Sequence, residues 1–258
     1  MSQARQPVLT VEQEEYLVIR SAALGFASGD FSVLEHDHEW PQLLYAITGA
    51  MTVNTGSTWW MIPAGKAVLI PGLRRHSIRM WGEVSMRTLY LSPELDAAAL
   101  REPDCRVLAV SPLLRELILR VIEMAALDRR VPEQARLAAV VLDEIGRAEV
   151  TPLELPAPAD ARAAAVAREV LAAPGEAATL DALARRHGVG RRTLERIFRA
   201  ETGMSFGMWQ QKARLLYSVR ALAESRPVTE AAFDAGYASV SAYIAAFKRT
   251  FGCTPGRL

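Results

Sequence analysis

Three of the four histidines in this chain of 258 residues lie in its N-terminal part. His36 and His38 are one residue apart, and Gln42 follows shortly after them. The third, His76, comes after the apolar stretch "AVLIPG". Residues two apart on a strand point to the same face, so we expect His36 and His38 to share one face. Such a set is a reasonable first shell for a divalent transition metal, and it suits Zn, Ni, Fe or Cu alike.

Three interpretations of this cluster stay open at the level of sequence. In the first, a divalent metal is bound by the three histidines, with or without Gln42. In the second, the same side chains line a polar pocket for a small organic effector without a metal. In the third, they are satisfied core histidines that bind nothing.

A second group of chemically active residues is cationic. Residues 160–258 contain 15 Lys+Arg and 9 Asp+Glu, a net charge of +6, whereas residues 1–159 contain 15 and 20, a net charge of −5. This asymmetry favours a polyanion as the partner of the C-terminal part. We expect a helix over residues 191–200 whose outward face carries Arg192, Glu195, Arg196 and Arg199. In a DNA major groove, Arg side chains reach base edges or phosphates, and Glu accepts from cytosine.

This helix belongs to a weak internal repeat. The copies are "TLDALARRHGVGRRTLERIFRAETG" and "VTEAAFDAGYASVSAYIAAFKRTFG". Each predicts a helix, a turn and a second helix, because Gly188 and Gly236 can adopt the left-handed conformation that ends a helix. A helix expected over residues 206–224 joins the copies and spans about 28 Å at 1.5 Å per residue. Since successive major grooves are about 34 Å apart, two recognition helices can face one side of a duplex.

The N-terminal part must position the histidines. From about residue 15 to 92 it shows short β-like runs broken by Gly and Pro, which predict a small antiparallel barrel or sandwich. Two amphipathic helices are expected between about 111 and 148, followed by a proline-rich linker over 150–160. The expected fold class is α+β, with an effector-binding and dimerisation domain over 1–149. The all-α domain over 161–258 holds two helix-turn-helix units joined by a long helix.

Composition restricts the class of protein. Half of the residues are apolar and 23% are charged, as in globular proteins, and no apolar run is long enough to cross a bilayer. The two cysteines, Cys105 and Cys253, show no paired spacing, which fits a reducing compartment. We therefore expect a cytoplasmic protein that does not interact with membranes.

Two long stretches carry a specific resemblance: "LARRHGVGRRTLERIFRAETGMSFGMWQQKARL" and "VTEAAFDAGYASVSAYIAAFKRTFGCTP". They resemble the DNA-binding domain of the AraC/XylS family of bacterial transcription regulators, in which the first recognition helix usually dominates base readout. By position this implicates Arg192, Glu195 and Arg196, while the second unit is expected to contact mainly phosphates. The expected DNA-binding residues are Arg191, Arg192, Glu195, Arg196, Arg199, Ser239, Ser241, Lys248 and Arg249.

The histidine spacing resembles the cupin barrel that many AraC-type regulators carry. The match consists of His36, His38, Gln42 and Gly49 for the first cupin motif and Gly65, Pro71 and His76 for the second. Gln42 stands where metal-binding cupins have a carboxylate, and Leu73 stands where Gly is usual. The run "HDHEWPQLLYAITG" also resembles a subgroup of these regulators in which Gln is the expected residue.

These features predict a sequence-specific DNA-binding transcriptional regulator whose activity is modulated by a metal ion or small molecule in the N-terminal barrel. The expected partners are double-stranded DNA, the effector and a second copy of the chain, with RNA polymerase as a further candidate. One alternative is a metal-dependent cupin enzyme fused to a DNA-binding domain, which the missing carboxylate ligand disfavours. The other is a DNA-binding regulator without an effector.

Overall fold

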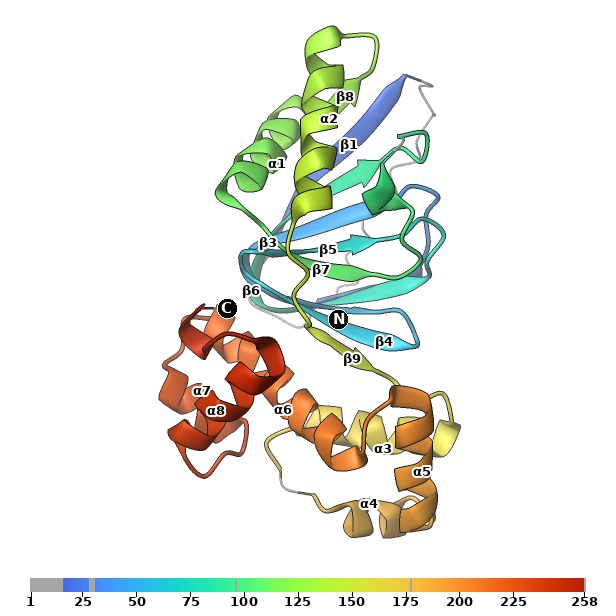
Figure 1. Ribbon diagram of the computed structural model, residues 1–258, viewed down its shortest axis with the longest axis vertical. Coiled ribbons are helices and arrows are strands. Elements are labelled where there is room, and N and C mark those ends of the chain that lie inside the picture. Colours follow the sequence, from blue (N-terminus) through green and yellow to red (C-terminus); the bar gives the residue numbers. More distant parts are fainter. Residues whose placement is uncertain (1–15, 28–30, 96, 177, 258) are drawn as a thin grey trace. The chain divides into compact units, whose positions relative to one another are not determined.

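The computed structural model describes residues 16–27, 31–95, 97–176 and 178–257 (Figure 1). The chain divides into two compact units, and the division does not follow chain order throughout. The first unit comprises Met1–Thr55 and Ile62–Thr151, and the second comprises Gly56–Met61 and Pro152–Leu258. The start of the expected barrel, at about residue 15, lies outside the described residues.

The first unit is built on an antiparallel sheet. Its strands are β1 (Leu17–Phe26), β2 (Ser32–His36), β3 (Gln42–Asn54), β5 (Lys66–Ile70), β6 (His76–Leu91), β7 (Arg106–Ala109) and β8 (Ala126–Asp128), while β4 (Thr58–Pro63) belongs to the second unit up to Met61. They pair in the order β7–β5–β3–β6–β1–β8, and β2 also pairs with β6. The expected antiparallel architecture is confirmed, and β7 and β8 extend it beyond the predicted limit of residue 92.

The two longest strands, β3 and β6, bend together. Along its other edge, β6 pairs first with β2 and then with β1, and the β3–β6 register shifts between Ala46 and Ala50. Gly49 and Gly82 lie at this bend with φ of 75° and 72°. A Cβ atom at Gly49 would lie 2.5 Å from the carbonyl oxygen of Glu83, so only glycine fits there without displacement. The bend therefore requires a residue without a side chain.

Helices α1 (Pro112–Met124) and α2 (Pro132–Arg147) follow the sheet, as expected from their apolar periodicity. The Ser111 side chain accepts a hydrogen bond from the backbone N–H of Leu114 and so caps α1. The helices contact β1, β6 and β8 (Figure 1). Their buried faces and the sheet share one apolar core, which includes Leu114, Ile118, Val121, Val141 and Ile145 from the helices and Ile19, Leu43, Leu89 and Leu127 from the strands.

The second unit is mainly helical. Its helices are α3 (Ala161–Ala172), α4 (Leu180–Arg186), α5 (Arg191–Thr202), α6 (Phe206–Ala223), α7 (Val228–Asp234) and α8 (Val240–Phe251). The pairs α4–α5 and α7–α8 correspond to the two copies of the repeat, and α6 joins them as predicted. Each pair turns at a glycine with positive φ, Gly188 and Gly236. Helix α3 was not predicted from the sequence; it is capped by Asp160, whose carboxylate accepts from two backbone N–H groups.

Part of the proline-rich interval between 149 and 160 is a paired strand. Strand β9 (Glu154–Pro156) runs antiparallel to Thr58–Trp60 of β4, and these residues all belong to the second unit. The Trp209 indole on α6 donates to the Pro156 carbonyl oxygen at 2.7 Å, and its ring lies 6.4 Å from that of Trp59. The pairing was not visible in the sequence because the partner strand lies about a hundred residues earlier.

Replacing Gly49 with Ala should lower the free energy of unfolding by about 2–4 kcal/mol, because the left-handed conformation and the overlap with Glu83 both oppose a Cβ atom. The control is Gly25→Ala on β1, where nothing lies within 4 Å and no positive φ is required. This control should change the stability by less than about 0.5 kcal/mol. Urea unfolding followed by circular dichroism measures both values, and equal stabilities would contradict the role of Gly49 in the bend.

Candidate histidine site and nucleic-acid interface

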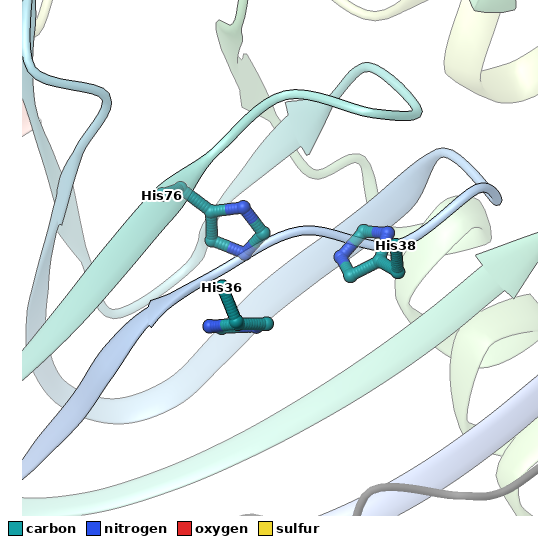
Figure 2. Close-up of side chains that lie close together, drawn as sticks. All are labelled: His36, His38 and His76. Carbon is teal, nitrogen blue, oxygen red and sulfur yellow. The ribbon is translucent and has the colours of Figure 1, made fainter.

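The structure brings the three predicted histidines together (Figure 2). His36 ends β2 and pairs in register with His76, the first residue of β6. The prediction that His36 and His38 share a strand is wrong, because His38 lies in the loop after β2. This loop runs to Pro41, and within it the Trp40 carbonyl oxygen lies 2.6 Å from His38 Nδ1. The imidazole rings nevertheless converge, with centroids 4.3 Å apart for His36–His76 and 5.1 Å for His38–His76.

The hydrogen bonds of the three rings determine their tautomers. Each Nδ1 atom lies 2.6–2.9 Å from a backbone carbonyl oxygen, which can only accept, so each Nδ1 carries a proton. The accepting carbonyls belong to Leu34 for His36, Trp40 for His38 and Arg74 for His76. In a neutral imidazole the Nε2 atom then has a free lone pair. Backbone carbonyls holding Nδ1–H in this way are typical of metal-ligating histidines.

Two of the three Nε2 atoms lack a hydrogen-bond donor among the described residues. The Nε2 atoms of His36 and His76 are buried and have no hydrogen-bond partner among the described residues. Ligand atoms from all three histidines lie within 4.8 Å of one another. Buried polar atoms are normally paired, so these lone pairs indicate a place for a cation or a donor group. The donor set therefore fits a transition metal.

Gln42, the predicted fourth residue, also reaches this cluster. Its side chain is fully buried at the start of β3, with Oε1 3.0 Å from His38 Nε2 and Nε2 3.0 Å from Thr88 Oγ1. Two acceptor atoms 3.0 Å apart repel, so this orientation requires a proton or a cation beside them. Rotating the amide by half a turn presents its NH₂ group to His38 and its oxygen to the Thr88 hydroxyl. Gln42 thus has one orientation suited to a bound cation and another suited to an empty site.

Burial keeps the imidazoles of His38 and His76 neutral. It lowers the pKa of His76 to about 4 and also lowers the pKa of His38, so both rings hold the unprotonated Nε2 at pH 7. The ring of Tyr90 lies edge-on to His38 at 5.2 Å, and burial raises the pKa of its hydroxyl. Sequence reasoning missed Thr88 and Tyr90. The signal for them was their alternation with apolar residues along β6.

The turn before β6 holds two of the histidines in place. The backbone N–H of Leu73 donates to the His38 carbonyl oxygen at 2.7 Å, and a Cβ atom at Gly72 would overlap the carbonyl oxygen of Glu39. Leu73 itself has a φ of 60°, which explains why a Gly is usual at this position. A non-glycine residue in this conformation costs about 1–3 kcal/mol and persists only where the surrounding contacts impose it.

On the second unit, α5 presents the predicted cationic face. Arg192, Arg196 and Arg199 are exposed and form no ion pair within the described part of the chain. Arg191 differs, because its guanidinium pairs with Asp181 of α4 at 3.0 Å. Glu195 is half-buried on the same helix. The opposite face of α5 is anchored by Leu194, Ile197 and Phe198, which are buried.

The second recognition helix, α8, is anchored in a comparable way and also has a side-chain cap. The Ser239 hydroxyl accepts from the backbone N–H of Ala242 at 3.2 Å, which leaves its own proton free to donate. Ser241, Lys248 and Arg249 are exposed on α8. The buried Tyr243 hydroxyl lies 2.9 Å from Ser218 Oγ and so links α8 to α6. By contrast, Gly190 begins α5 without a side-chain cap.

No helix in the described parts of the chain is long and apolar enough to cross a membrane.

Two family profiles match the chain, one for each half. The "AraC-like ligand binding domain" matches residues 27–141, and the "Helix-turn-helix domain" matches residues 183–258. The HTH-type transcriptional regulator NimR of Escherichia coli is 32% identical over 222 residues, which cover 86% of this chain and 80% of NimR. RipA of Corynebacterium glutamicum, also an HTH-type transcriptional regulator, is 35% identical over 100 residues, which cover 39% of this chain and 30% of RipA.

Among solved structures, ToxT from Vibrio cholerae aligns over 93% of this chain and 97% of its own, with a TM-score of 0.39 and 12% identity. The matched relatives are transcriptional regulators, so the chain is a regulator and the alternative of a cupin enzyme is set aside. Because NimR is 32% identical over four fifths of its own length and the two profiles match residues 27–141 and 183–258, this chain belongs to the AraC family of DNA-binding, helix-turn-helix transcriptional regulators.

Proposed function

We propose that this regulator senses a divalent transition metal bound by His36, His38 and His76, and that occupancy of the site changes its affinity for operator DNA. The observation that supports this proposal is that ligand atoms of the three histidines lie within 4.8 Å of one another, while the Nε2 atoms of His36 and His76 are buried and have no partner among the described residues. An organic effector would need several donor groups at the same point to satisfy these atoms. A single cation does so with one charge.

The ligand set restricts the metals to those that prefer nitrogen. Imidazole suits Zn, Ni, Cu and Fe, whereas Mg and Ca prefer oxygen ligands. Gln42 supplies a neutral amide oxygen where a carboxylate would neutralise part of the charge, so the bound ion keeps its full 2+ charge within the protein's own ligands. Removing one of these side chains should therefore weaken metal binding strongly, because none of His36, His38, Gln42 and His76 is anionic.

Metal-free protein should bind one equivalent of Zn(II) or Ni(II), and His76→Ala should weaken binding by at least about 100-fold, since it removes a buried ligand. Gln42→Glu should bind the same ion more tightly, because it adds a negative charge to the ligand set. His187→Ala is the control, since His187 pairs with Glu169 in the second unit. Isothermal titration calorimetry measures each affinity, and equal binding by His76→Ala and the parent would contradict the metal site.

For DNA, we propose that Arg192, Glu195 and Arg196 of α5 read base edges and that Arg199, Ser239, Ser241, Lys248 and Arg249 hold phosphates. Arg191 is engaged by Asp181, so it contributes to the position of α5 and less to the DNA contact. The support is that these side chains of α5 and α8 lie opposite the buried faces of their helices. We expect the protein to bind as a cytoplasmic homodimer through α1 and α2, where Leu113 and Val140 are exposed apolar side chains. RNA polymerase is a further candidate partner.

Arg196→Ala should cost about 1–3 kcal/mol of binding to a duplex selected from random sequence with the parent protein, and it should relax the base preference at one position. Lys248→Ala should instead weaken binding to all sequences alike and reduce the slope of log affinity against log salt by about one. Fluorescence anisotropy at several salt concentrations distinguishes the two effects. If Arg196→Ala kept the full sequence preference of the parent, base reading by this residue would be excluded.

The effector signal has a short covalent route to the DNA-binding unit. The chain leaves the first unit after Thr55 and returns to it at Ile62, and the intervening residues belong to the second unit. In this segment Trp59 pairs with Leu155 of β9 and lies against Trp209 of α6, the helix that joins the two helix-turn-helix units. We propose that a change in the first unit is transmitted through this segment to α6.

Trp59→Ala should reduce the effect of Zn(II) or Ni(II) on DNA affinity while leaving the metal affinity within about twofold, because the variant removes the contact with Trp209 and no metal ligand. Trp59→Phe keeps an aromatic ring there and should retain most of the response. Anisotropy with and without the metal, beside calorimetry, tests both. An unchanged metal response in Trp59→Ala would show that the signal takes another route.

A further inference from the structure

We propose that Arg214, Gly236 and Gly175 form an interlock that holds the second helix-turn-helix unit against the first, and that this interlock determines which spacing of DNA half-sites the protein accepts. Arg214 lies on α6, Gly236 in the turn between α7 and α8, and Gly175 in the loop between α3 and α4. All three belong to the second compact unit.

Gly188 and Gly236, the turn glycines of the two repeat copies, differ in how closely other segments approach them. Both have positive φ, 62° at Gly188 and 74° at Gly236. A Cβ atom at Gly188 would meet nothing within 4 Å, so glycine is needed there only for its conformation. A Cβ atom at Gly236 would overlap both the Arg214 guanidinium and the carbonyl oxygen of Gly175. The second turn is therefore packed against two other segments, whereas the first is open.

Arg214 donates two hydrogen bonds to the turn between α7 and α8. Its Nε donates to the Ala235 carbonyl oxygen at 2.9 Å, and its Nη2 donates to the Gly236 carbonyl oxygen at 2.6 Å. Its guanidinium also lies 5.5 Å from the centroid of the Tyr237 ring. The guanidinium donates from two separate nitrogen atoms held in one plane, whereas a lysine would have to reach both carbonyls from a single nitrogen and would lose this geometry.

Gly175 connects the turn between α7 and α8 to the loop that leads into α4, the first helix of the first helix-turn-helix unit. A Cβ atom at Gly175 would overlap the carbonyl oxygen of Asp234, although no positive φ is required at this position. The same loop is held by α6, because Gln210 Nε2 donates to the Ala178 carbonyl oxygen at 3.0 Å. Ala178 directly precedes Thr179, the cap of α4. Gln210 and Arg214 are one helical turn apart on α6. The same side of α6 therefore donates hydrogen bonds both to the loop before α4 and to the turn between α7 and α8.

The interlock affects which spacing between DNA half-sites the protein can accept. Helix α6 fixes the distance between α5 and α8 and holds α8 through the Tyr243–Ser218 contact. The interlock adds a direct contact between the loop before α4 and the turn before α8, which further restricts how the second helix-turn-helix unit can move relative to the first. One inserted base pair moves a half-site by about 3.4 Å and rotates it by roughly a tenth of a turn. A locked pair of recognition helices cannot follow this change, while a released pair can.

The test uses the full-length protein and a duplex selected from random sequence with the parent. Three probes are compared: the selected duplex, the same duplex with one base pair inserted between its half-sites, and a duplex in which the half-site read by α8 is scrambled. The parent should prefer the selected spacing over the inserted one by at least about 10-fold. Arg214→Lys should lower this preference to below about threefold, while its affinity for the scrambled duplex stays within twofold of the parent.

Gly175→Ala should behave in the same way, and Gly207→Ala is its matched control. Gly207 lies on α6, where nothing is within 4 Å of an added Cβ atom and no positive φ is required. This control should keep the parent's spacing preference. If Gly175→Ala fails to fold, as thermal denaturation would show, Arg214→Lys decides alone. An Arg214→Lys variant that retains the 10-fold preference, or that loses affinity for all three probes in equal proportion, would overturn the proposal.

Discussion

The curl of strand β6 is the constraint on which the histidine site depends. His76 and Tyr90 are 14 residues apart on this strand, a distance of about 46 Å if the strand were straight. Yet the ring of His38 lies 5.1 Å from one and 5.2 Å from the other. The sheet must therefore fold back on itself, and the glycines at the β3–β6 bend permit this. The convergence of the lone pairs is thus a property of the whole sheet and not of the motif alone.

Close backbone contacts that only glycine allows occur in the DNA-binding unit as well. Gly175 and Gly236 allow backbone segments more than fifty residues apart to touch, just as Gly72 allows the turn before β6 to rest on the loop that carries His38. In each case a carbonyl oxygen occupies the space of the absent Cβ atom. These contacts position functional groups in both units, and they tolerate little change because backbone atoms cannot move aside as a flexible side chain does.

Much of the fold and part of the site could be predicted because their signals are local. Periodicity and turn glycines identified α4 to α8, and motif spacing identified His36, His38, Gln42 and His76. What escaped prediction depends on distant partners. Strand β9 pairs with residues about a hundred positions earlier, Tyr90 meets His38 only through the curl of β6, and Gly175 meets Asp234 across the helical unit. No local sequence pattern predicts such contacts. His38 does not lie on a strand as expected, because β2 ends at His36 and a loop follows as far as Pro41.

The energetics of the histidine cluster argue against a purely structural role. A buried polar atom left without any partner costs about 1–3 kcal/mol, and the Nε2 atoms of His36 and His76 have no partner among the described residues. The net stability of a domain is only about 5–15 kcal/mol. Apolar residues of similar size would remove this cost, as they do elsewhere in the sheet, where Met51, Ile78 and Met80 are fully buried or nearly so. Three imidazoles that are held in one tautomer by backbone carbonyls, two of them with a buried Nε2 atom lacking a partner among the described residues, suit the proposed cation site, in which a bound ion would add to the stability of the fold.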